Sequence, residues 1–86
     1  MNIEFTKAFN KQFEKLQKKY QDKAKATVAV FLQDMYTPSL RTHALKGEWI
    51  GFYSISAGGD LRLHFKMINQ NTILFVAVGS HSQLYK

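Results

Sequence analysis

Apolar residues recur at two different spacings along the chain, and the spacing changes near the middle. In the first half they follow the three-to-four-residue period of amphipathic helices. In the second half polar and apolar residues alternate, as they do in strands that bury one face. The sequence therefore predicts an α+β fold, in which helices pack on one face of a mainly antiparallel sheet.

The helical half contains a short opening strand and two helices joined by a brief polar link at residues 21–22 into an antiparallel hairpin. Thr6 is a suitable N-cap for the first helix and Asp22 for the second, and Pro38 ends the second helix. The predicted segments are residues 2–5, about 6–20 and about 22–36.

Three strands are expected in the second half, over residues of about 49–55, 60–68 and 72–78. Gly58-Gly59 and residues 69–71 supply the turns between them. The last strand is apolar on both faces, which is expected near the centre of a sheet. With 86 residues and a hydrophobic fraction of 45%, the chain is expected to form a single domain over residues 1–86.

The composition narrows the classes of function. The absence of cysteine excludes a disulfide scaffold, a thiolate metal site and a cysteine nucleophile. A formal charge of +6 favours polyanionic partners such as nucleic acid. The longest apolar run, residues 73–78, is too short to span a bilayer, and the N-terminus lacks the apolar run of a signal peptide. We expect a soluble cytoplasmic protein with no membrane partner.

The strand predicted at residues 60–68 has a polar face of unusual chemistry. Asp60, Arg62, His64 and Lys66 alternate there with apolar residues. A solvated strand face would show the same alternation, but the closing segment 79–85 adds His81 and Tyr85, which can transfer protons. Together with the positive charge, this pattern indicates a surface that handles phosphate, most plausibly that of RNA.

Short motifs in the second half stand in a fixed order: Leu45–Trp49, Tyr53–Ser56, Asp60–Arg62, Gly79–His81 and Tyr85. In this order and spacing they resemble the RelE/ParE superfamily of bacterial toxins, and within it the RelE-like and YafQ-like mRNA interferases. The resemblance implies the toxin of a type II toxin–antitoxin pair. Such toxins cleave translated mRNA on the ribosome without a metal or other cofactor, and a small antitoxin protein silences them.

The resemblance also implies active-site roles for individual residues of this chain. His43, Asp60 and His81 match active-site residues of YafQ-type toxins, Arg62 matches the RelE-type arginine, and Tyr85 matches the RelE-type catalytic tyrosine. Arg62 would stabilise transition-state charge and His81 would transfer a proton. Asp60 would orient a histidine, while Tyr85 would stack on a base or relay a proton. Further RNA contacts are expected from Arg41, Lys46 and Lys66.

Two positions depart from the YafQ-type pattern. Ser56 stands where those toxins carry another catalytic histidine, and Leu61 replaces their tryptophan. The site would therefore combine features of both subfamilies, which leaves the division between acid and base open. A basic helix face would add sequence-independent attraction to rRNA. This face comprises Lys7, Lys11, Lys15, Lys18 and Lys19.

Each assignment has a plainer alternative. His81 and His43 could be solvated surface histidines, and Asp60 could be an ordinary turn residue. His64 has no counterpart in the family pattern, so it is not assigned to the site. The three histidines lie on different predicted elements without ligand spacing, which does not favour a metal site. Trp49 and Tyr53 are expected to be packing aromatics.

Two other functions compete with the nuclease. One is a ParE-like toxin that inhibits a topoisomerase by binding, and the ending His81 to Tyr85 disfavours it. The other is a degenerate member that only binds its antitoxin or RNA, for which Ser56 in place of a histidine is the supporting feature.

Overall fold

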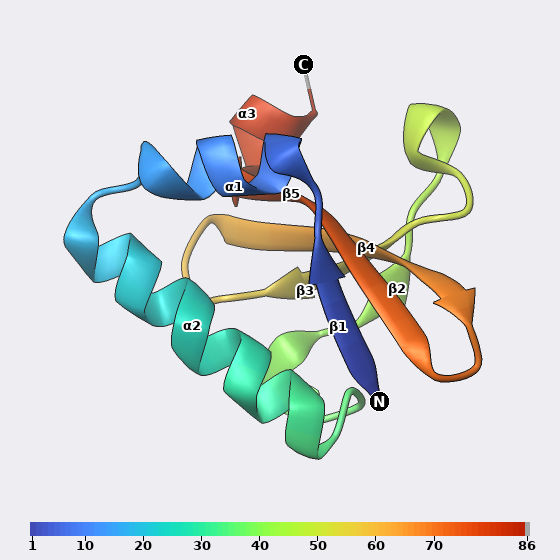
Figure 1. Ribbon diagram of the computed structural model, residues 1–86. Coiled ribbons are helices and arrows are strands. Elements are labelled where there is room, and N and C mark those ends of the chain that lie inside the picture. The colour runs from blue at the N-terminus through green and yellow to red at the C-terminus, as the bar shows by residue number, and fades with distance from the viewer. Residues whose placement is uncertain (86) are drawn as a thin grey trace.

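The computed structural model describes residues 1–85 and places five strands in one mixed sheet, with helices packed against it (Figure 1). The strands are β1 (Asn2–Phe5), β2 (His43–Ala44), β3 (Tyr53–Ser56), β4 (Leu61–Asn69) and β5 (Thr72–Ser80). The helices are α1 (Lys7–Glu14), α2 (Lys18–Gln33) and α3 (His81–Leu84), and the 3₁₀ helices are η1 (Pro38–Leu40) and η2 (Gly47–Trp49). This architecture confirms the predicted α+β fold.

The strand order is β1-β5-β4-β3-β2, so that β4 is the central strand. β1 runs parallel to β5, with Asn2 opposite Thr72, and the other neighbours are antiparallel. β5 lies between β1 and β4, which confirms the interior position predicted from its two apolar faces.

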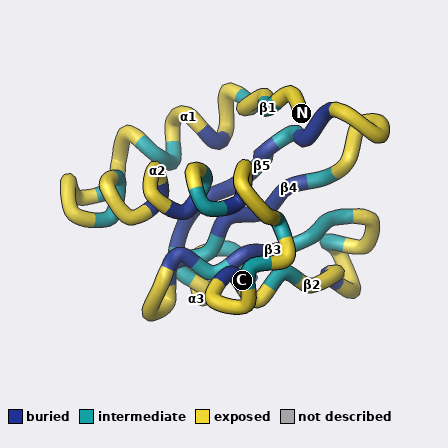
Figure 2. The backbone as a smooth tube through the Cα atoms, turned by 90° about the horizontal axis from the view of Figure 1, so that it is seen from below, coloured by how far each residue is buried: buried dark blue, intermediate teal, exposed yellow. Residues whose placement is uncertain are grey.

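The core lies between the sheet and the two longer helices. Phe9 of α1 and Phe31 of α2 are buried against Phe65 and Phe75 of the two inner strands. Phe31 packs edge-on against both rings, with centroids 4.9 Å and 5.5 Å away. Figure 2 shows the buried residues concentrated in the sheet and the exposed residues on the outer sides of the helices. Within residues 1–85, no helix is long and apolar enough to cross a membrane.

The break between the first two helices lies at residues 15–17 and not at the predicted residues 21–22. Leu16 and Tyr20 are both half-buried against the same core, so their spacing continues the helical period through the break. Gln21, inside α2, donates its side-chain amide to the carbonyl of Phe13 and thereby caps α1 (3.0 Å). In Figure 1 the two helices diverge from this link and do not form the expected antiparallel hairpin.

Of the two predicted N-caps, one is confirmed and the other is wrong. Thr6 is confirmed as the N-cap of α1, since its hydroxyl accepts the N–H of Phe9 at 3.0 Å. Asp22 lies inside α2, where it pairs with Lys18 at 2.9 Å, and is not an N-cap. α2 ends at Gln33, three residues before the predicted end, so Pro38 begins η1 and does not terminate the helix.

The strand predicted at 49–55 begins only at Tyr53, because residues 47–49 form η2 and a turn follows at residues 50–51. Gly47 and Gly51 have φ angles of 65° and 92°, which glycine adopts without strain. β4 and β5 begin and end within two residues of the predicted bounds 60–68 and 72–78. His43, which falls outside every strand predicted from the sequence, lies in the two-residue strand β2.

Candidate active site

The central strand β4 carries the candidate site on the face of the sheet opposite α1 and α2. Alternate β4 residues belong to the buried core beneath the helices: Leu61, Leu63 and Phe65. Successive side chains of a strand point to opposite faces, so the polar row lies on the other side. This row comprises Arg62, His64 and Lys66.

The neighbouring strand β5 presents small residues to this row. Arg62 lies opposite Gly79 and His64 lies opposite Ala77. The register between β4 and β5 shifts just beyond this pair, where Val76 is the extra residue of a bulge. The bulge brings Ala77 and Gly79 under the polar face, and their size leaves room there for the longer side chains of β4.

On the other side of β4, hydroxyl and imidazole groups complete the face. Ser56 lies opposite Arg62, Ser54 lies opposite His64, and His43 lies opposite Ser54. The side chains of His43, Ser54 and His64 therefore follow one line across three adjacent strands.

The guanidinium of Arg62 is fixed to the turn between β3 and β4. Its Nη1 donates to the carbonyls of Gly59 (2.9 Å) and Leu61 (3.1 Å) and to Oγ of Ser56 (3.4 Å). Among residues 1–85, no carboxylate forms an ion pair with it. Because a guanidinium has five N–H donors in a planar fork, this anchoring sets the orientation of the remaining donors.

Helix α3 turns back over the site from the end of β5. Ser80 and Gln83 form a capping box: Ser80 Oγ accepts the N–H of Gln83 (3.1 Å), and Gln83 Oε1 accepts the N–H of Ser80 (2.8 Å). A Cβ at Gly79 would lie 2.9 Å from Gln83 Oε1, so the absence of a side chain there permits this packing. The N–H of His81 donates to the carbonyl of Asp60 at 3.0 Å.

Two aromatic rings cover His64. The Trp49 ring meets it edge-on at a centroid distance of 4.4 Å, and the Tyr85 ring lies 5.4 Å away. Tyr85 also packs on the imidazole of His81 at 4.4 Å. The indole N–H of Trp49 donates to the carbonyl of Leu84 at 3.2 Å, which joins η2 to the end of α3.

This cover changes the protonation of the site. Burial, together with the positive charges of His43 and His81, lowers the pKa of His64 from 6.5 to about 4. Burial also raises the pKa of Tyr85 above 10.0, although the neighbouring charge of Arg62 opposes this shift. At neutral pH, His64 is therefore uncharged and Tyr85 keeps its proton.

The structure brings several of the predicted site residues together and leaves others apart. Arg62, His81 and Tyr85 surround His64, and His43 lies on the same line across the sheet. Asp60 touches this group through its backbone carbonyl. Within residues 1–85, its carboxylate forms no hydrogen bond with a histidine.

The predicted RNA-binding residues are peripheral to this group. Arg41 and Lys46 are exposed on either side of β2. The backbone carbonyl of Arg41 also lies 2.8 Å from Nδ1 of His43. Lys66 lies farther along β4, with Nζ 5.7 Å from the ring centroid of Phe52.

Sequence reasoning missed the central residues of this face. His64 shares the alternating row with Arg62, which was the available signal, but nothing in the sequence shows that it is covered. Trp49 packs on the polar face and not in the main core, because η2 turns it there. The expected packing role of Tyr53 is confirmed by its stacking on Phe65 at 5.5 Å.

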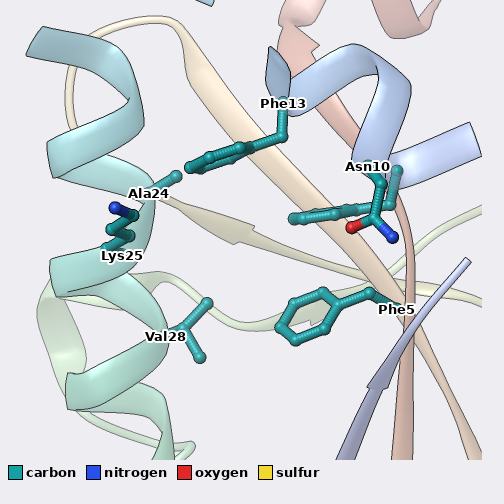
Figure 3. Close-up of a pocket in the computed structure, with 7 residues that line it drawn as sticks. Phe5, Asn10, Phe13, Ala24, Lys25 and Val28 are labelled. Carbon is teal, nitrogen blue, oxygen red and sulfur yellow. The ribbon is translucent and has the colours of Figure 1, made fainter. Parts of the chain in front are cut away.

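A separate apolar cavity of about 300 Å³ lies on the helical side of the sheet (Figure 3). Aromatic rings from β1 and α1 line one side of the cavity, and side chains of α2 line the other. The lining residues are Phe5, Phe9, Asn10, Phe13, Ala24, Lys25 and Val28. The cavity shares no residue with the polar face of β4.

A sheet covered by two helices on one face, with arginine, histidine and a tyrosine close to the end of the chain on the other, defines a small toxin of the RelE/ParE type. The family model described as bacterial toxin of type II toxin–antitoxin system, YafQ, matches residues 1–86, and the chain belongs to this family. The chain is therefore a toxin of a type II toxin–antitoxin system. No curated protein gives a match.

Solved structures of similar fold cover nearly the whole chain. YafQ from E. coli strain BL21(DE3) has 20% identity and a TM-score of 0.83, with 99% of this chain and 98% of that chain covered. The E. coli DinJ–YafQ complex has 23% identity, a TM-score of 0.76 and the same coverage. A metal-bound toxin from Helicobacter pylori has 29% identity, a TM-score of 0.71 and 98% coverage of both chains.

The Helicobacter structure raises the question of metal ligands in this chain. Of the side chains in residues 1–85, no group of three or more His, Asp or Glu is placed to hold a metal ion together. No ligand set is assigned on this basis.

Proposed function

We propose that this toxin is an endoribonuclease that cuts mRNA on the translating ribosome and so inhibits translation, without a metal in the reaction. The main support for this proposal is the guanidinium of Arg62. Its Nη1 is held by the carbonyl of Gly59, and within residues 1–85 it has no carboxylate partner. Tyr85 lies near the charge of Arg62 and packs on His81, and His43 lies on the same face in line with His64. This combination suits the cleavage of a phosphodiester, in which a cation must neutralise the developing negative charge and protons must be transferred.

The chemistry is an internal transesterification. The ribose 2′-hydroxyl loses its proton to a base, and its oxygen attacks the adjacent phosphorus while the P–O5′ bond breaks. Arg62 stabilises charge on the non-bridging oxygens, and His81 gives a proton to the departing 5′-oxygen. Asp60 holds His81 through its backbone carbonyl. Tyr85, protonated at neutral pH, supplies a ring for base stacking and a hydroxyl donor.

His43 is oriented for contact with RNA. A carbonyl oxygen only accepts, so Nδ1 of His43 carries the proton donated to the carbonyl of Arg41, and Nε2 is left for contact with RNA. The exposed side chains of Arg41 and Lys46 and the half-buried Lys66 would bind adjacent phosphates.

The ribosome would complete the site by fixing the geometry of the message, so that part of the orientation comes from outside the protein. The basic helix face lies on the opposite side of the sheet from Arg62, and its five lysines are exposed. They would contact rRNA while the polar face of β4 meets mRNA.

The proposal includes a cognate antitoxin. A similar chain, E. coli YafQ, has been solved in complex with DinJ. The formal charge of +6 favours an antitoxin with an acidic or amphipathic segment that gains order on binding.

The test is to express the toxin inducibly and to map 5′ ends on mRNA, with and without ribosomes, beside Arg62→Ala. We expect ribosome-dependent cuts in wild type and a loss of about 10²- to 10⁴-fold in cleavage in the variant. Lys23→Ala is the matched control, because it removes one positive charge from an exposed helix position. Thermal unfolding would show that all three proteins fold.

Two other results would support the alternative functions. Growth arrest with intact mRNA and early DNA damage would support a topoisomerase inhibitor. Normal growth on strong expression of folded protein would support a degenerate member that only binds its antitoxin or RNA.

A further inference from the structure

Two polar side chains beneath the polar face are buried without a hydrogen-bond partner. Ser54 and His64 are 1% and 0% exposed, and within residues 1–85 neither Ser54 Oγ nor either ring nitrogen of His64 has a partner. The two residues lie directly opposite each other on β3 and β4. Native proteins rarely leave such groups unpaired, and the exceptions include catalytic groups.

The layer that covers these groups is thin. Trp49 comes from the three-residue η2, and Tyr85 is the first residue after the four-residue α3. The indole N–H of Trp49 holds the carbonyl of Leu84, but within residues 1–85 the hydroxyl of Tyr85 forms no hydrogen bond. The Tyr85 ring can therefore move without breaking any strand pairing.

The position under Tyr85 is adjacent to the phosphate-binding group. Arg62 and His64 point to the same face and are two residues apart on one strand, a separation of about 6–7 Å. The Tyr85 ring packs on both imidazoles, with its centroid 4.4 Å from that of His81 and 5.4 Å from that of His64. A phosphate held by Arg62 would thus place its ribose between the two imidazoles if the Tyr85 ring moved aside.

We infer that His64 is a further catalytic residue, the base that takes the 2′-hydroxyl proton once a nucleotide has displaced Tyr85. This inference rests on the proposed function. The proton passes from O2′ to a ring nitrogen of His64 as the O2′–P bond forms. The P–O5′ bond breaks, and O5′ keeps the electron pair and takes a proton from the imidazolium of His81. The products are a 2′,3′-cyclic phosphate and a 5′-hydroxyl.

The groups around His64 keep its imidazole in the unprotonated form from which a base must start. His43 faces it from β2, Arg62 lies on its own strand, and His81 and Tyr85 approach from the C-terminal segment. Its pKa of about 4 keeps the imidazole neutral and able to accept a proton. Displacement of Tyr85 removes part of the burial that lowers this pKa, so the uncovered imidazole is a stronger base than the covered one.

The decisive experiment compares cleavage and stability in His64→Phe. Phenylalanine keeps a ring between Trp49 and Tyr85 and removes the two unpaired nitrogens, so we expect a melting temperature at or above that of wild type. We also expect cleavage of mRNA on programmed ribosomes to fall about 10²- to 10⁴-fold in a single turnover. Wild-type cleavage by a folded His64→Phe would overturn the inference.

A second variant separates proton transfer from packing. In His64→Ala, added imidazole should restore cleavage, whereas thiazole, a ring of similar size but a far weaker base, should not. Equal rescue by both rings, or none by imidazole, would overturn the inference. Wild-type protein in the same assay tests the proposed function separately, since a wild type that cuts no mRNA overturns the nuclease itself.

Discussion

The imidazole of His64 shows how the surroundings of one side chain set its chemistry. On an open strand face it would titrate near 6.5, but beneath Trp49 and Tyr85 its pKa is lowered to about 4. The same burial raises the pKa of Tyr85. The polar face therefore joins a permanent cation, Arg62, to an imidazole that stays neutral in mildly acidic solution.

Stability should depend on pH through this residue. The unfolded chain binds a proton at His64 below about pH 6.5, whereas the folded chain binds it only near pH 4. Between these values the unfolded state holds more protons, so the free energy of unfolding falls as the pH falls. We expect a loss on the order of 2 kcal/mol after allowance for solvent screening.

Urea unfolding at a series of pH values between about 7 and 4.5 checks this dependence. His64→Phe lacks the group, so its unfolding free energy should fall less across the same window. Parallel curves for the two proteins would contradict the assignment.

At the scale of elements, the position of α3 depends on features of its neighbours. The capping box of Ser80 and Gln83 starts it, the missing side chain of Gly79 admits it, and the indole of Trp49 holds its last carbonyl. A four-residue helix has little stability of its own. These contacts therefore decide where His81 and Tyr85 lie.

Gly79→Ala should displace α3 and leave the sheet intact. Its Cβ would lie 2.9 Å from Gln83 Oε1, so the end of the Gln83 side chain must shift away from the N–H of Ser80 that it caps. Trp49 is the single tryptophan of the chain, and its emission reports its contact with Leu84. We expect a red shift in that emission and a loss of cleavage, with far-UV circular dichroism close to that of wild type.

Ser82→Ala is the matched control for Gly79→Ala. Ser82 is exposed in the same helix, and within residues 1–85 its side chain forms one hydrogen bond, with Ser80 Oγ at 3.4 Å. Its emission spectrum should coincide with that of wild type. An unshifted spectrum in Gly79→Ala would show that the helix tolerates the extra carbon.

The elements that the sequence predicted well are those with local signals. The alternation in β4 and the cap at Thr6 each depend on a few adjacent residues, and both are confirmed. The helix break was misplaced because Leu16 and Tyr20 pack on one core from two different helices. An apolar period reports the buried side of a segment, and it does not report whether the backbone is continuous.

The candidate site was predictable only in part, for a related reason. Arg62 and its alternating neighbours follow from strand geometry, and their grouping with residues 81 and 85 follows from the family resemblance. The cover over His64 depends on a turn at Gly47–Trp49 and on a helix that folds back from β5. Such contacts between distant segments leave no periodic pattern in the sequence.

The whole molecule has two surfaces of different character. One face of the sheet carries the helices and their lysines, and the other carries the polar row of β4. A net charge of +6 favours long-range attraction to RNA, which is sequence-independent and sensitive to salt. The helical surface therefore suits attachment, and the polar row suits chemistry.

Binding to ribosomes should accordingly weaken as salt is raised. Replacing Lys7 and Lys11 together by alanine should reduce the slope of log affinity against log salt by at most about 2. Lys18 already pairs with Asp22 at 2.9 Å, so Lys18→Ala should change the slope less. Sedimentation with ribosomes over a salt series measures both, and an unchanged slope in the double variant would remove the helix face from the binding surface.

The parallel pairing of β1 with β5 also constrains the order in which the strands of the sheet can pair during synthesis. β1 is synthesised first, yet Asn2 pairs with Thr72, so β1 must wait until most of the chain has been made. Closing so long a loop costs entropy and slows folding, and the strand edge of β5 stays open until it happens. The sheet, and with it the polar face of β4, is therefore complete only after β5 has been made and β1 has paired with it.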